Sequence, residues 1–467
     1  MPLVIPEGLV VGVSGFRGRV GDPLTPELVC LLATAFGAFV KRSRDPSNDL
    51  PVEILLGRDT RTSGPVLSRA VSAGLVSVGC NVVDLGIVST PTLMLAVENS
   101  DALGGIAVTA SHNPAEWNAL KLAAPEGTFL DAETMSKFLE FALSEDPPRS
   151  PSDELGAVTT DDRASARHLE AVLELPQLNL PALRARAFKV ALDCVRGAGA
   201  TIMPQLLEAL GCEVVGINME MDGLFPRDPE PTAENLTELA DFVRREGADI
   251  GLAVDPDVDR LSLVNENGAP IGEDLTLALA SAVVLRRTPG IVVTNLSTSA
   301  IVEDVARAHA SELVRSPVGE INVARRMQLE GAVVGGEGNG GVILPNLHHT
   351  RDAPVAAALV LQHLVDEETS LSAAVDKWPA YTIVKKKISF PREALSEGYA
   401  ELERQLESGG VDSADGVRFC WEARRTWLHV RPSGTEPVVR LIAEAPERSE
   451  AEELIEWSEE ILAMVVQ

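Results

Sequence analysis

The chain has 467 residues, more than one hydrophobic core can serve, so we expect about three or four domains. Hydrophobic residues make up 45% of it and charged residues 23%, as in globular proteins, and no run of about 18 apolar residues indicates a membrane span. The formal net charge of -29 opposes binding to nucleic acid or to an anionic membrane, because both require a basic surface, and we expect neither partner.

The first residues favour a cytoplasmic protein. They lack the basic region and the cleavage site of a signal peptide, and GVSGFRGRV (Gly12–Val20) is a glycine-rich polar loop where such a peptide would be apolar. The five cysteines lie far apart without a C-x-x-C pair and mostly in apolar segments. We expect buried thiols in a reducing compartment.

A strand–helix–strand unit is repeated along the chain. VEILLGRD (Val52–Asp59) and FKVALDCVRGAGA (Phe188–Ala200) each predict an apolar strand, then a helix-length segment and a second strand that begins near Gly-Cys-x-Val-Val. Residues 290–320 are a fainter third copy. Such units form parallel or mixed sheets. We therefore expect three similar α/β domains, and one large α/β sheet is the alternative.

VTASHNPAEWNALK (Val108–Lys121) places a serine beside a histidine. In Ser-His-Asp hydrolases the activating histidine comes from elsewhere in the chain, neighbouring side chains usually point apart, and the sequence lacks G-x-S-x-G. We therefore do not expect His112 to deprotonate Ser111. Alternatively, Ser111 carries a phosphoryl group beside a metal ion, and Lys121 acts on a sugar hydroxyl.

Two breaks predict how the chain is divided. SEDPPRSPSDE (Ser144–Glu154) is rich in proline, serine and acidic residues and predicts a linker. After DKWPAY (Asp376–Tyr381) the pattern changes to strand, helix, several strands and a closing amphipathic helix, which predicts a smaller α+β domain. We expect domains at residues 1–150, 155–265, 266–376 and 380–467.

DPDVDR (Asp255–Arg260) follows an apolar strand and predicts a divalent metal site. The side chains of Asp255, Asp257 and Asp259 can project to one side, where they repel one another unless a cation neutralises them. Hard oxygen ligands favour Mg²⁺ or Ca²⁺ over zinc. The pattern lacks the glycine and the distal glutamate of an EF-hand. A solvated acidic turn is the alternative.

Three glycine-containing turns could bind a sugar phosphate. In GGEGNGG (Gly335–Gly341), Glu337 and Asn339 offer hydrogen-bond partners to vicinal hydroxyls. In RPSGTEP (Arg431–Pro437), backbone N–H groups and the Arg431 guanidinium can form an anion cradle. In the third turn, GVSGFRGRV (Gly12–Val20), Arg17 could stabilise a transferring phosphoryl group. Each could also be only a structural or solvated turn.

These motifs together resemble those of the α-D-phosphohexomutase family, in the same order and over the whole chain. TASHNP is similar to the family's phosphoserine loop, DPDVDR to its magnesium loop, GEGNGG to its sugar-recognition loop, RPSGTEP to its phosphate-binding loop and GFRG to its N-terminal arginine loop. The resemblance implies three similar mixed-sheet α/β domains and a smaller α+β C-terminal domain, like that of the TATA-box-binding protein, around a central cleft.

The resemblance also implies a reaction. Phosphorylated Ser111 would give its phosphoryl group to a hexose 1- or 6-phosphate, and the bisphosphate would turn over and return the other phosphoryl group. The implied cofactors are Mg²⁺ and a hexose 1,6-bisphosphate activator. The implied enzyme is a monomer or homodimer that acts on small sugar phosphates.

Site roles follow from the resemblance by position. The metal ligands would be Ser111, through its phosphate, Asp255, Asp257 and Asp259, with Arg260 supporting their loop. The transferring phosphoryl group would be surrounded by Arg17, His112 and Lys121, with Lys121 as the proton shuttle. Glu337 and Asn339 would recognise the sugar's 3- and 4-hydroxyls. The nonreacting phosphate would be held by Arg431, Ser433, Gly434 and Thr435, and Gly319 would lie in a further substrate loop.

The substrate is less specified. Asn339 and the PSGTEP form of the phosphate loop resemble a branch of the family that acts on glucosamine phosphate, and this resemblance implies that substrate, with mannose and glucose phosphates as the alternatives. A sugar-phosphate-binding regulator without catalysis is a further alternative, which the intact Ser111, aspartates and Lys121 disfavour.

Overall fold

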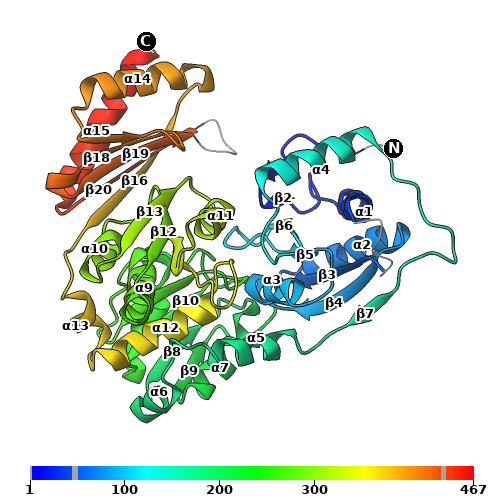
Figure 1. Cartoon of the computed structure of the whole chain (residues 1–467), viewed down its shortest axis with the longest axis horizontal. Coiled ribbons are helices and arrows are strands. Elements are labelled where there is room, and N and C mark those ends of the chain that lie inside the picture. Colours follow the sequence, from blue (N-terminus) through cyan, green and yellow to red (C-terminus); the bar gives the residue numbers. More distant parts are fainter. Residues whose placement is uncertain (1–2, 45–50, 433–437, 467) are drawn as a thin grey trace.

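The computed structural model describes residues 3–44, 51–432 and 438–466, and these residues form four β-sheets. Three of the sheets share one pattern, in which three parallel strands are followed by an antiparallel fourth (Figure 1). In the first sheet this order is β4 (Asn81–Ile87), β3 (Glu53–Arg58), β5 (Gly105–Val108) and β6 (Trp117–Ala123).

The second and third sheets repeat this order of strands. The second consists of β9 (Glu213–Ile217), β8 (Lys189–Asp193), β10 (Ile250–Val254) and β11 (Leu261–Asn265). The third consists of β13 (Glu312–Ser316), β12 (Ile291–Asn295), β14 (Val334–Glu337) and β15 (Gly341–Ile343). The prediction of three similar mixed-sheet α/β units is confirmed.

The first sheet has three additional strands. β1 (Val10–Gly12) and β2 (Gly15–Arg19) form a hairpin, and β2 pairs with β6. β7 (Val158–Thr160) pairs with β4 at the other edge. The predicted linker therefore leads to this edge, and Ser150 N donates to Ser77 O along the way. The predicted domain bounds stay a prediction.

Helices cover both faces of the first sheet. Ile54 and Leu56 of β3 pack under α1 (Pro26–Ser43) and α2 (Gly64–Ser77), and α4 (Ala132–Ser144) joins the same core. Leu55, between them, faces the opposite side with α3 (Thr90–Glu98) and the start of α5 (Ala164–Leu173). Because side chains alternate along a strand, a sheet buried on both faces has the continuous apolar run that the sequence shows here.

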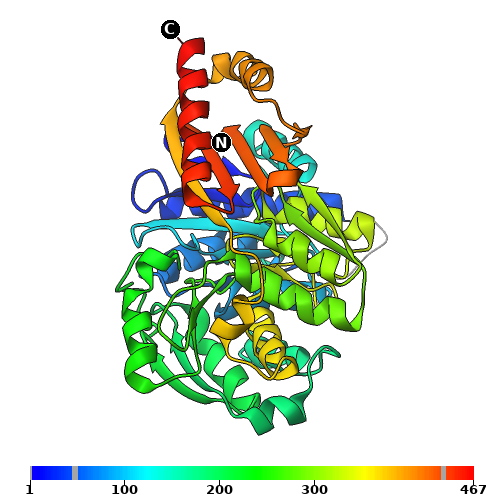
Figure 2. The same cartoon turned by 90° about the vertical axis from the view of Figure 1, so that its left-hand side faces the viewer.

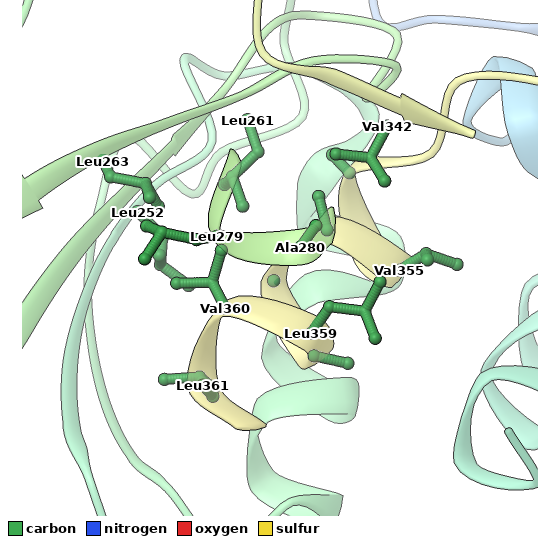
Figure 3. Packing of buried hydrophobic residues seen from close by; sticks show 14 of the residues in the cluster. Leu252, Leu261, Leu263, Leu279, Ala280, Val342, Val355, Leu359, Val360 and Leu361 are labelled. Carbon is green, nitrogen blue, oxygen red and sulfur yellow. The ribbon is translucent and has the colours of Figure 1, made fainter. Parts of the chain in front are cut away.

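The second and third sheets share one hydrophobic core. Leu252 and Leu263 from β10 and β11 lie beside Leu279 of α9 (Asp274–Arg287) and Leu359 of α12 (Ala353–Asp366), as Figure 3 shows. Helix α12 begins where the Asp352 side chain accepts a hydrogen bond from Val355 N. The other helices of these units are α6 (Leu180–Arg186), α7 (Met203–Ala209), α8 (Thr237–Glu246), α10 (Ile301–Ala308), α11 (Glu320–Glu330) and α13 (Leu371–Val375).

The fourth sheet is antiparallel throughout. Its order is β16 (Thr382–Ser389), β20 (Val438–Ala445), β19 (Thr426–Pro432), β18 (Val417–Trp421) and β17 (Gly410–Asp412), and it packs with α14 (Leu395–Gln405) and α15 (Arg448–Val465). The α+β expectation is confirmed, and the likeness to the TATA-box-binding protein stays a prediction. In Figures 1 and 2, α15 and the green α6–α7 region lie at opposite ends of the molecule.

Two further expectations were tested by the structure. Among the described helices, none combines the length and the apolar content needed to cross a bilayer. All five cysteines are free thiols, and Cys80, Cys194 and Cys212 are buried. The expectation of buried thiols is wrong for Cys30 and Cys420, which are only half-buried.

Candidate active site

The three sequence motifs of the α/β units lie at the same place in the repeat. Each forms the turn between the third parallel strand and the antiparallel strand: residues 109–116 between β5 and β6, 255–260 between β10 and β11, and 338–340 between β14 and β15. Strand pairing fixes both ends of each turn. The paired strands therefore fix the position of each short turn.

Ser111 is buried, with a side chain aimed at the metal loop. Its Oγ donates to Oδ2 of Asp255 at 2.8 Å and lies 3.3 Å from Nδ1 of His112. The expectation that these neighbouring side chains point apart is wrong, because Ser111 has a left-handed backbone (φ 49°) that non-glycine residues rarely adopt. Burial, with Arg260 and Arg17 nearby, holds the pKa of His112 well below its usual value, so its imidazole is neutral.

Arg61 holds the Ser111 loop in place, and the sequence motifs did not include it. The side chain is fully buried, and its Nε pairs with Asp59 at 3.0 Å. The two Nη atoms donate to four carbonyl oxygens of the loop, those of Ser111, Asn113 and Pro114 at 2.6 Å and that of Trp117 at 2.9 Å. The available signal was an arginine two residues after a strand-end aspartate.

The three aspartates of the metal loop converge. All are fully buried, and each offers an oxygen within 4.8 Å of the others. Burial, with the other two carboxylates nearby, raises the pKa of Asp255 well above its usual value. Burial would also raise the pKa of Asp257, but the Lys121 ammonium and the Thr90 hydroxyl outweigh it and hold that pKa below its usual range.

The oxygens of this loop fit a divalent cation. Among the described residues, Asp257 Oδ1 and Asp259 Oδ1 accept no hydrogen bond although both are buried. A buried carboxylate oxygen without a partner is costly unless a cation neutralises it. Three carboxylates and a serine oxygen are ligands that Mg²⁺ and Ca²⁺ prefer. The residues present can therefore hold a metal ion.

Cationic side chains surround the metal loop. Lys121 of β6 is buried, and its Nζ donates to Oδ2 of Asp257 at 2.6 Å. Arg17 of β2 donates to Asn113 Oδ1 at 2.7 Å, and burial lowers its pKa. Arg260 donates to Glu230 Oε1 at 3.1 Å, while its backbone N donates to Asp255 Oδ1 at 3.2 Å. The basic side chains around the metal loop thus come from two units: Arg17 and Lys121 from the first, and Arg260 from the second.

Arg351 joins the metal loop to the sugar-recognition loop, and it too was missed. Its Nη2 lies 2.5 Å from Asp259 Oδ2, its Nη1 lies 2.7 Å from Glu337 Oε2, and its Nε lies 3.2 Å from Glu320 Oε2. All four side chains are buried. The available signal was a charged residue just before the apolar helix α12.

The structure brings Gly319, Glu337 and Asn339 together. Glu337 Oε1 accepts hydrogen bonds from Gly319 N at 3.0 Å and from Asn295 Nδ2 at 2.8 Å, and its Oε2 lies 3.4 Å from Asn339 Nδ2. Burial would raise the pKa of Glu337, but Arg351 and these donors lower it, so the side chain is a carboxylate.

Arg431 ends β19 in the C-terminal domain. Its Nε pairs with Asp415 Oδ2 at 2.9 Å, and this oxygen also accepts a hydrogen bond from Val318 N at 3.1 Å, next to Gly319. The structure thus links Arg431 to the Gly319 loop. The predicted phosphate-binding residues Ser433, Gly434 and Thr435 lie outside the described residues.

A second buried cluster joins all three α/β units beside the site. Asp352 Oδ2 lies 2.8 Å from Nε2 of both His168 and His348, and its Oδ1 accepts a hydrogen bond from Val355 N. His168 Nδ1 lies 2.8 Å from the Thr92 hydroxyl of α3. Contacts at these distances are hydrogen bonds, which hold α3 of the first unit against α5 and α12.

Four family models match the chain in order. They are the phosphoglucomutase/phosphomannomutase alpha/beta/alpha domains I, II and III, at residues 8–148, 166–268 and 272–381, and the C-terminal domain, at residues 392–457. Two solved structures share the fold. A phosphoglucomutase/phosphomannomutase family protein from Burkholderia thailandensis has a TM-score of 0.86 at 24% identity and covers 99% of this chain and 98% of its own. A putative phosphomannomutase from Thermus thermophilus has a TM-score of 0.82 at 25% identity, over 98% and 100%.

Relatives in sequence extend over nearly the whole chain. A probable phosphoglucosamine mutase from Methanopyrus kandleri is 38% identical over 453 residues, which are 96% of each chain. A phosphoglucomutase/phosphomannomutase from Thermococcus kodakarensis is 36% identical over 459 residues, 97% of this chain and 98% of the relative. The chain therefore belongs to the phosphoglucomutase/phosphomannomutase family and is a phosphohexomutase, an isomerase of the intramolecular phosphotransferase class.

Proposed function

We propose that the protein is a phosphoglucosamine mutase, which interconverts glucosamine 6-phosphate and glucosamine 1-phosphate through phosphorylated Ser111 and a 1,6-bisphosphate. The observation that carries this proposal is the 2.8 Å contact between Ser111 Oγ and Asp255, inside a buried group of three carboxylates with unpaired oxygens. His112 Nδ1 also lies 3.3 Å from Ser111 Oγ, but the serine donates its hydrogen bond to the carboxylate group, whose oxygens can hold the cation that a phosphoryl carrier needs.

In the proposed mechanism each residue of the first two loops has a defined task. Asp255, Asp257, Asp259 and a phosphate oxygen on Ser111 would hold Mg²⁺, which when bound offsets the charge of the transferring group. Arg61 keeps the loop backbone fixed through four carbonyls. Arg17 and the neutral His112 can donate to phosphoryl oxygens, and Arg260 supports the metal loop.

Lys121 is the proposed proton shuttle. The Asp257 carboxylate holds its Nζ at 2.6 Å, beside the Ser111 loop. In the forward step the Lys121 ammonium would give a proton to the Ser111 oxygen as the phosphoryl group leaves, and the resulting amine would take the proton of the attacking sugar hydroxyl. In the return step the same exchange would run in reverse, so that the released sugar oxygen is protonated as Ser111 loses its proton and is phosphorylated again. One residue can perform both steps because the bisphosphate presents its two ends in turn.

The other two loops would bind the sugar phosphate that is not reacting. Glu337 and Asn339 can contact vicinal hydroxyls, and Gly319 places the backbone of its loop against Glu337. Arg431, with Ser433, Gly434 and Thr435, would hold the second phosphate. This division supports a site that treats either end of the bisphosphate alike.

Glucosamine phosphate is the proposed substrate on two grounds. Asn339 and Gly434 stand in the recognition loops, and the relatives from Methanopyrus kandleri and Methanosarcina barkeri are named probable phosphoglucosamine mutases. The Thermococcus kodakarensis relative, named phosphoglucomutase/phosphomannomutase, makes glucose and mannose phosphates the second candidates. We further propose a cytoplasmic enzyme, monomeric or homodimeric, with a 1,6-bisphosphate activator.

A side-by-side assay tests the substrate. Coupled measurements of kcat/KM with Mg²⁺ and bisphosphate on glucosamine, glucose and mannose phosphates should be highest for glucosamine phosphate. If glucosamine phosphate were the poorest of the three, the proposed substrate would be wrong.

Ser111→Ala tests the phosphoryl carrier. The variant should lose turnover on all three sugars, and its intact mass should show no added phosphate after incubation with glucose 1,6-bisphosphate. Ser144→Ala, at an exposed serine of α4, is the control and should behave as the unaltered protein. Full activity of Ser111→Ala would contradict the mechanism, and an unaltered protein that takes up no phosphate would favour the regulator.

A further inference from the structure

Asp415 lies where the C-terminal domain meets the third α/β unit. Its turn joins β17 and β18, and the side chain is 19% exposed. One oxygen, Oδ2, pairs with Arg431 Nε at 2.9 Å and accepts a hydrogen bond from Val318 N at 3.1 Å. A single carboxylate thus contacts the phosphate-binding arginine of one domain and the substrate loop of another.

The turn that carries Asp415 is fixed to the strand that carries Arg431. Gly416 has φ 73°, and a Cβ there would lie 2.3 Å from Val430 O and 2.8 Å from Arg431 Cα. Only glycine fits so close to β19. In addition, His429 Nε2 of β19 lies 2.6 Å from Asp415 O. Asp415 and Arg431 therefore move together as parts of one body.

Val318 belongs to a different body. It precedes Gly319, whose N donates to Glu337 Oε1 at 3.0 Å, and Glu337 in turn pairs with Arg351 at 2.7 Å. Arg351 contacts Asp259 of the metal loop at 2.5 Å. The bond from Val318 to Asp415 is thus the step that continues this series of polar contacts into the C-terminal domain.

Other contacts also join these two domains, and one lies near the substrate loop: Ser297 Oγ is 2.8 Å from His429 Nδ1. Arg425 of the C-terminal domain pairs with Asp304 of α10 and contacts Tyr381. Tyr381 lies in the segment that connects the two domains. Glu444 Oε1 accepts hydrogen bonds from Ala300 N at 2.8 Å and from Trp427 Nε1 at 2.7 Å. These contacts join the domains without the Asp415 side chain, so a substitution of Asp415 leaves them in place.

We propose that Asp415 is a positioning residue that orients Arg431 and joins it to the substrate loop, so that it determines how firmly the bisphosphate is retained while it turns over. This inference depends on the proposed function. The carboxylate pairs with Arg431 inside the C-terminal domain and accepts the Val318 hydrogen bond across the domain boundary. It therefore fixes the proposed phosphate arginine relative to the loop that contacts Glu337.

Two variants separate the two contacts. Asp415→Ala removes both the Arg431 ion pair and the hydrogen bond from Val318 N. We expect KM for the sugar monophosphate and the bisphosphate concentration for half-maximal activation each to rise about tenfold, the effect of losing a hydrogen bond to a charged group. Asp415→Asn keeps an oxygen for Val318 N but loses the ion pair, so KM should rise while the bisphosphate requirement stays within about twofold of the unaltered enzyme. With both ligands saturating, kcat should change by less than about threefold in either variant.

Asp412→Ala is the matched control. It removes a carboxylate from the same turn that accepts a hydrogen bond from Ala414 N, within the turn itself. It should leave both constants unchanged. If Asp415→Ala is poorly folded by thermal unfolding, Asp415→Asn still tests the orientation of Arg431 through KM.

Three results would overturn the inference: unchanged constants in both variants, a fall in kcat alone, or an Asp412→Ala effect equal to that of Asp415→Ala. An unaltered protein inactive on every sugar phosphate would instead refute the proposed function, and the two failures are therefore distinguishable.

Discussion

Lys121 and Asp257 form a buried ion pair, with Nζ 2.6 Å from Oδ2, and the Thr90 hydroxyl donates to the same oxygen at 2.7 Å. The other oxygen of this carboxylate, Oδ1, has no partner among the described residues. One oxygen of Asp257 therefore serves the proposed proton shuttle, while the other is free for a metal ion. The two functions compete for the negative charge of a single side chain.

Lys121→Met should separate these functions. Turnover should fall by about 10²-fold or more because the proton shuttle is lost. Mg²⁺ should bind the unphosphorylated protein more tightly, because an ammonium group no longer neutralises Asp257. Titration calorimetry measures the binding, and Lys137→Met, at an exposed lysine of α4, is the control. Weaker Mg²⁺ binding by Lys121→Met would contradict this account of the pair.

Arg351 should matter for both folding and binding. Arg351→Met leaves the buried carboxylates of Asp259, Glu320 and Glu337 without their shared partner, and removing one side of a buried ion pair costs about 3–5 kcal/mol. Urea unfolding should show a loss of this size. Arg351→Lys keeps the charge but cannot form the fork, so it should be more stable than Arg351→Met and still raise KM. Arg307→Lys, at an exposed arginine, should do neither.

Gly340 fixes the sugar-recognition loop to the strand after the metal loop. Its φ is 86°, a Cβ would lie 2.4 Å from Leu261 O, and its own carbonyl accepts a hydrogen bond from Leu261 N at 3.0 Å. We expect Gly340→Ala to raise KM for the sugar phosphate and to lower the midpoint of thermal unfolding. Gly410→Ala, where nothing lies within 4 Å of the added Cβ, should change neither. An unchanged KM in Gly340→Ala would refute the close approach.

Asp274 should make stability depend on pH. The side chain is half-buried beside Gly338 of the sugar-recognition loop, with Oδ1 accepting a hydrogen bond from Ser299 N at 2.8 Å. Burial raises its pKa from 3.8 to about 7, partly opposed by Lys385 and reinforced by Glu444 and Glu273. Because the folded pKa is the higher one, this contribution to stability is complete below pH 3.8 and is lost as the pH rises to about 7.

Asp274→Asn should remove the loss of stability that accompanies rising pH, because asparagine does not ionise. The variant should be more stable than the unaltered protein at pH 8, by up to about 4 kcal/mol for a shift of this size, and the difference should shrink steadily toward pH 4. Urea unfolding at pH 5, 6 and 8 measures it, with the exposed Asp241→Asn as control. A difference that does not change with pH would show that Asp274 does not titrate in this range.

Local patterns in the sequence predicted much of the candidate site. Ser111, the three aspartates, Glu337 and Arg431 each lie directly at a strand end, where alternation and turn residues leave a readable signal. The convergence of the three aspartates was also accessible to reasoning, because close carboxylates repel one another unless a cation or a proton neutralises them.

The residues that support these loops left no such signal. Arg61 contacts backbone carbonyls about 50 residues away, and backbone oxygens have no sequence pattern. Arg351 pairs with Asp259, 92 residues earlier. The orientation of His112 depends on the left-handed backbone angle at Ser111, and a serine in the sequence does not predict such an angle. The common core of the second and third units arises from α9 and α12, which pack across both sheets.

The motif turns of the three α/β units occupy the same position in the repeated unit. Two paired strands fix both ends of each turn, so residues of the turn can change while the strand pairing stays the same. In the proposed mechanism one copy of this turn carries the phosphoryl group, one holds the metal ion and one contacts the sugar hydroxyls. The proposed roles are thus divided among equivalent positions of a repeated unit, so a turn exchanged between copies would meet the same pair of flanking strands.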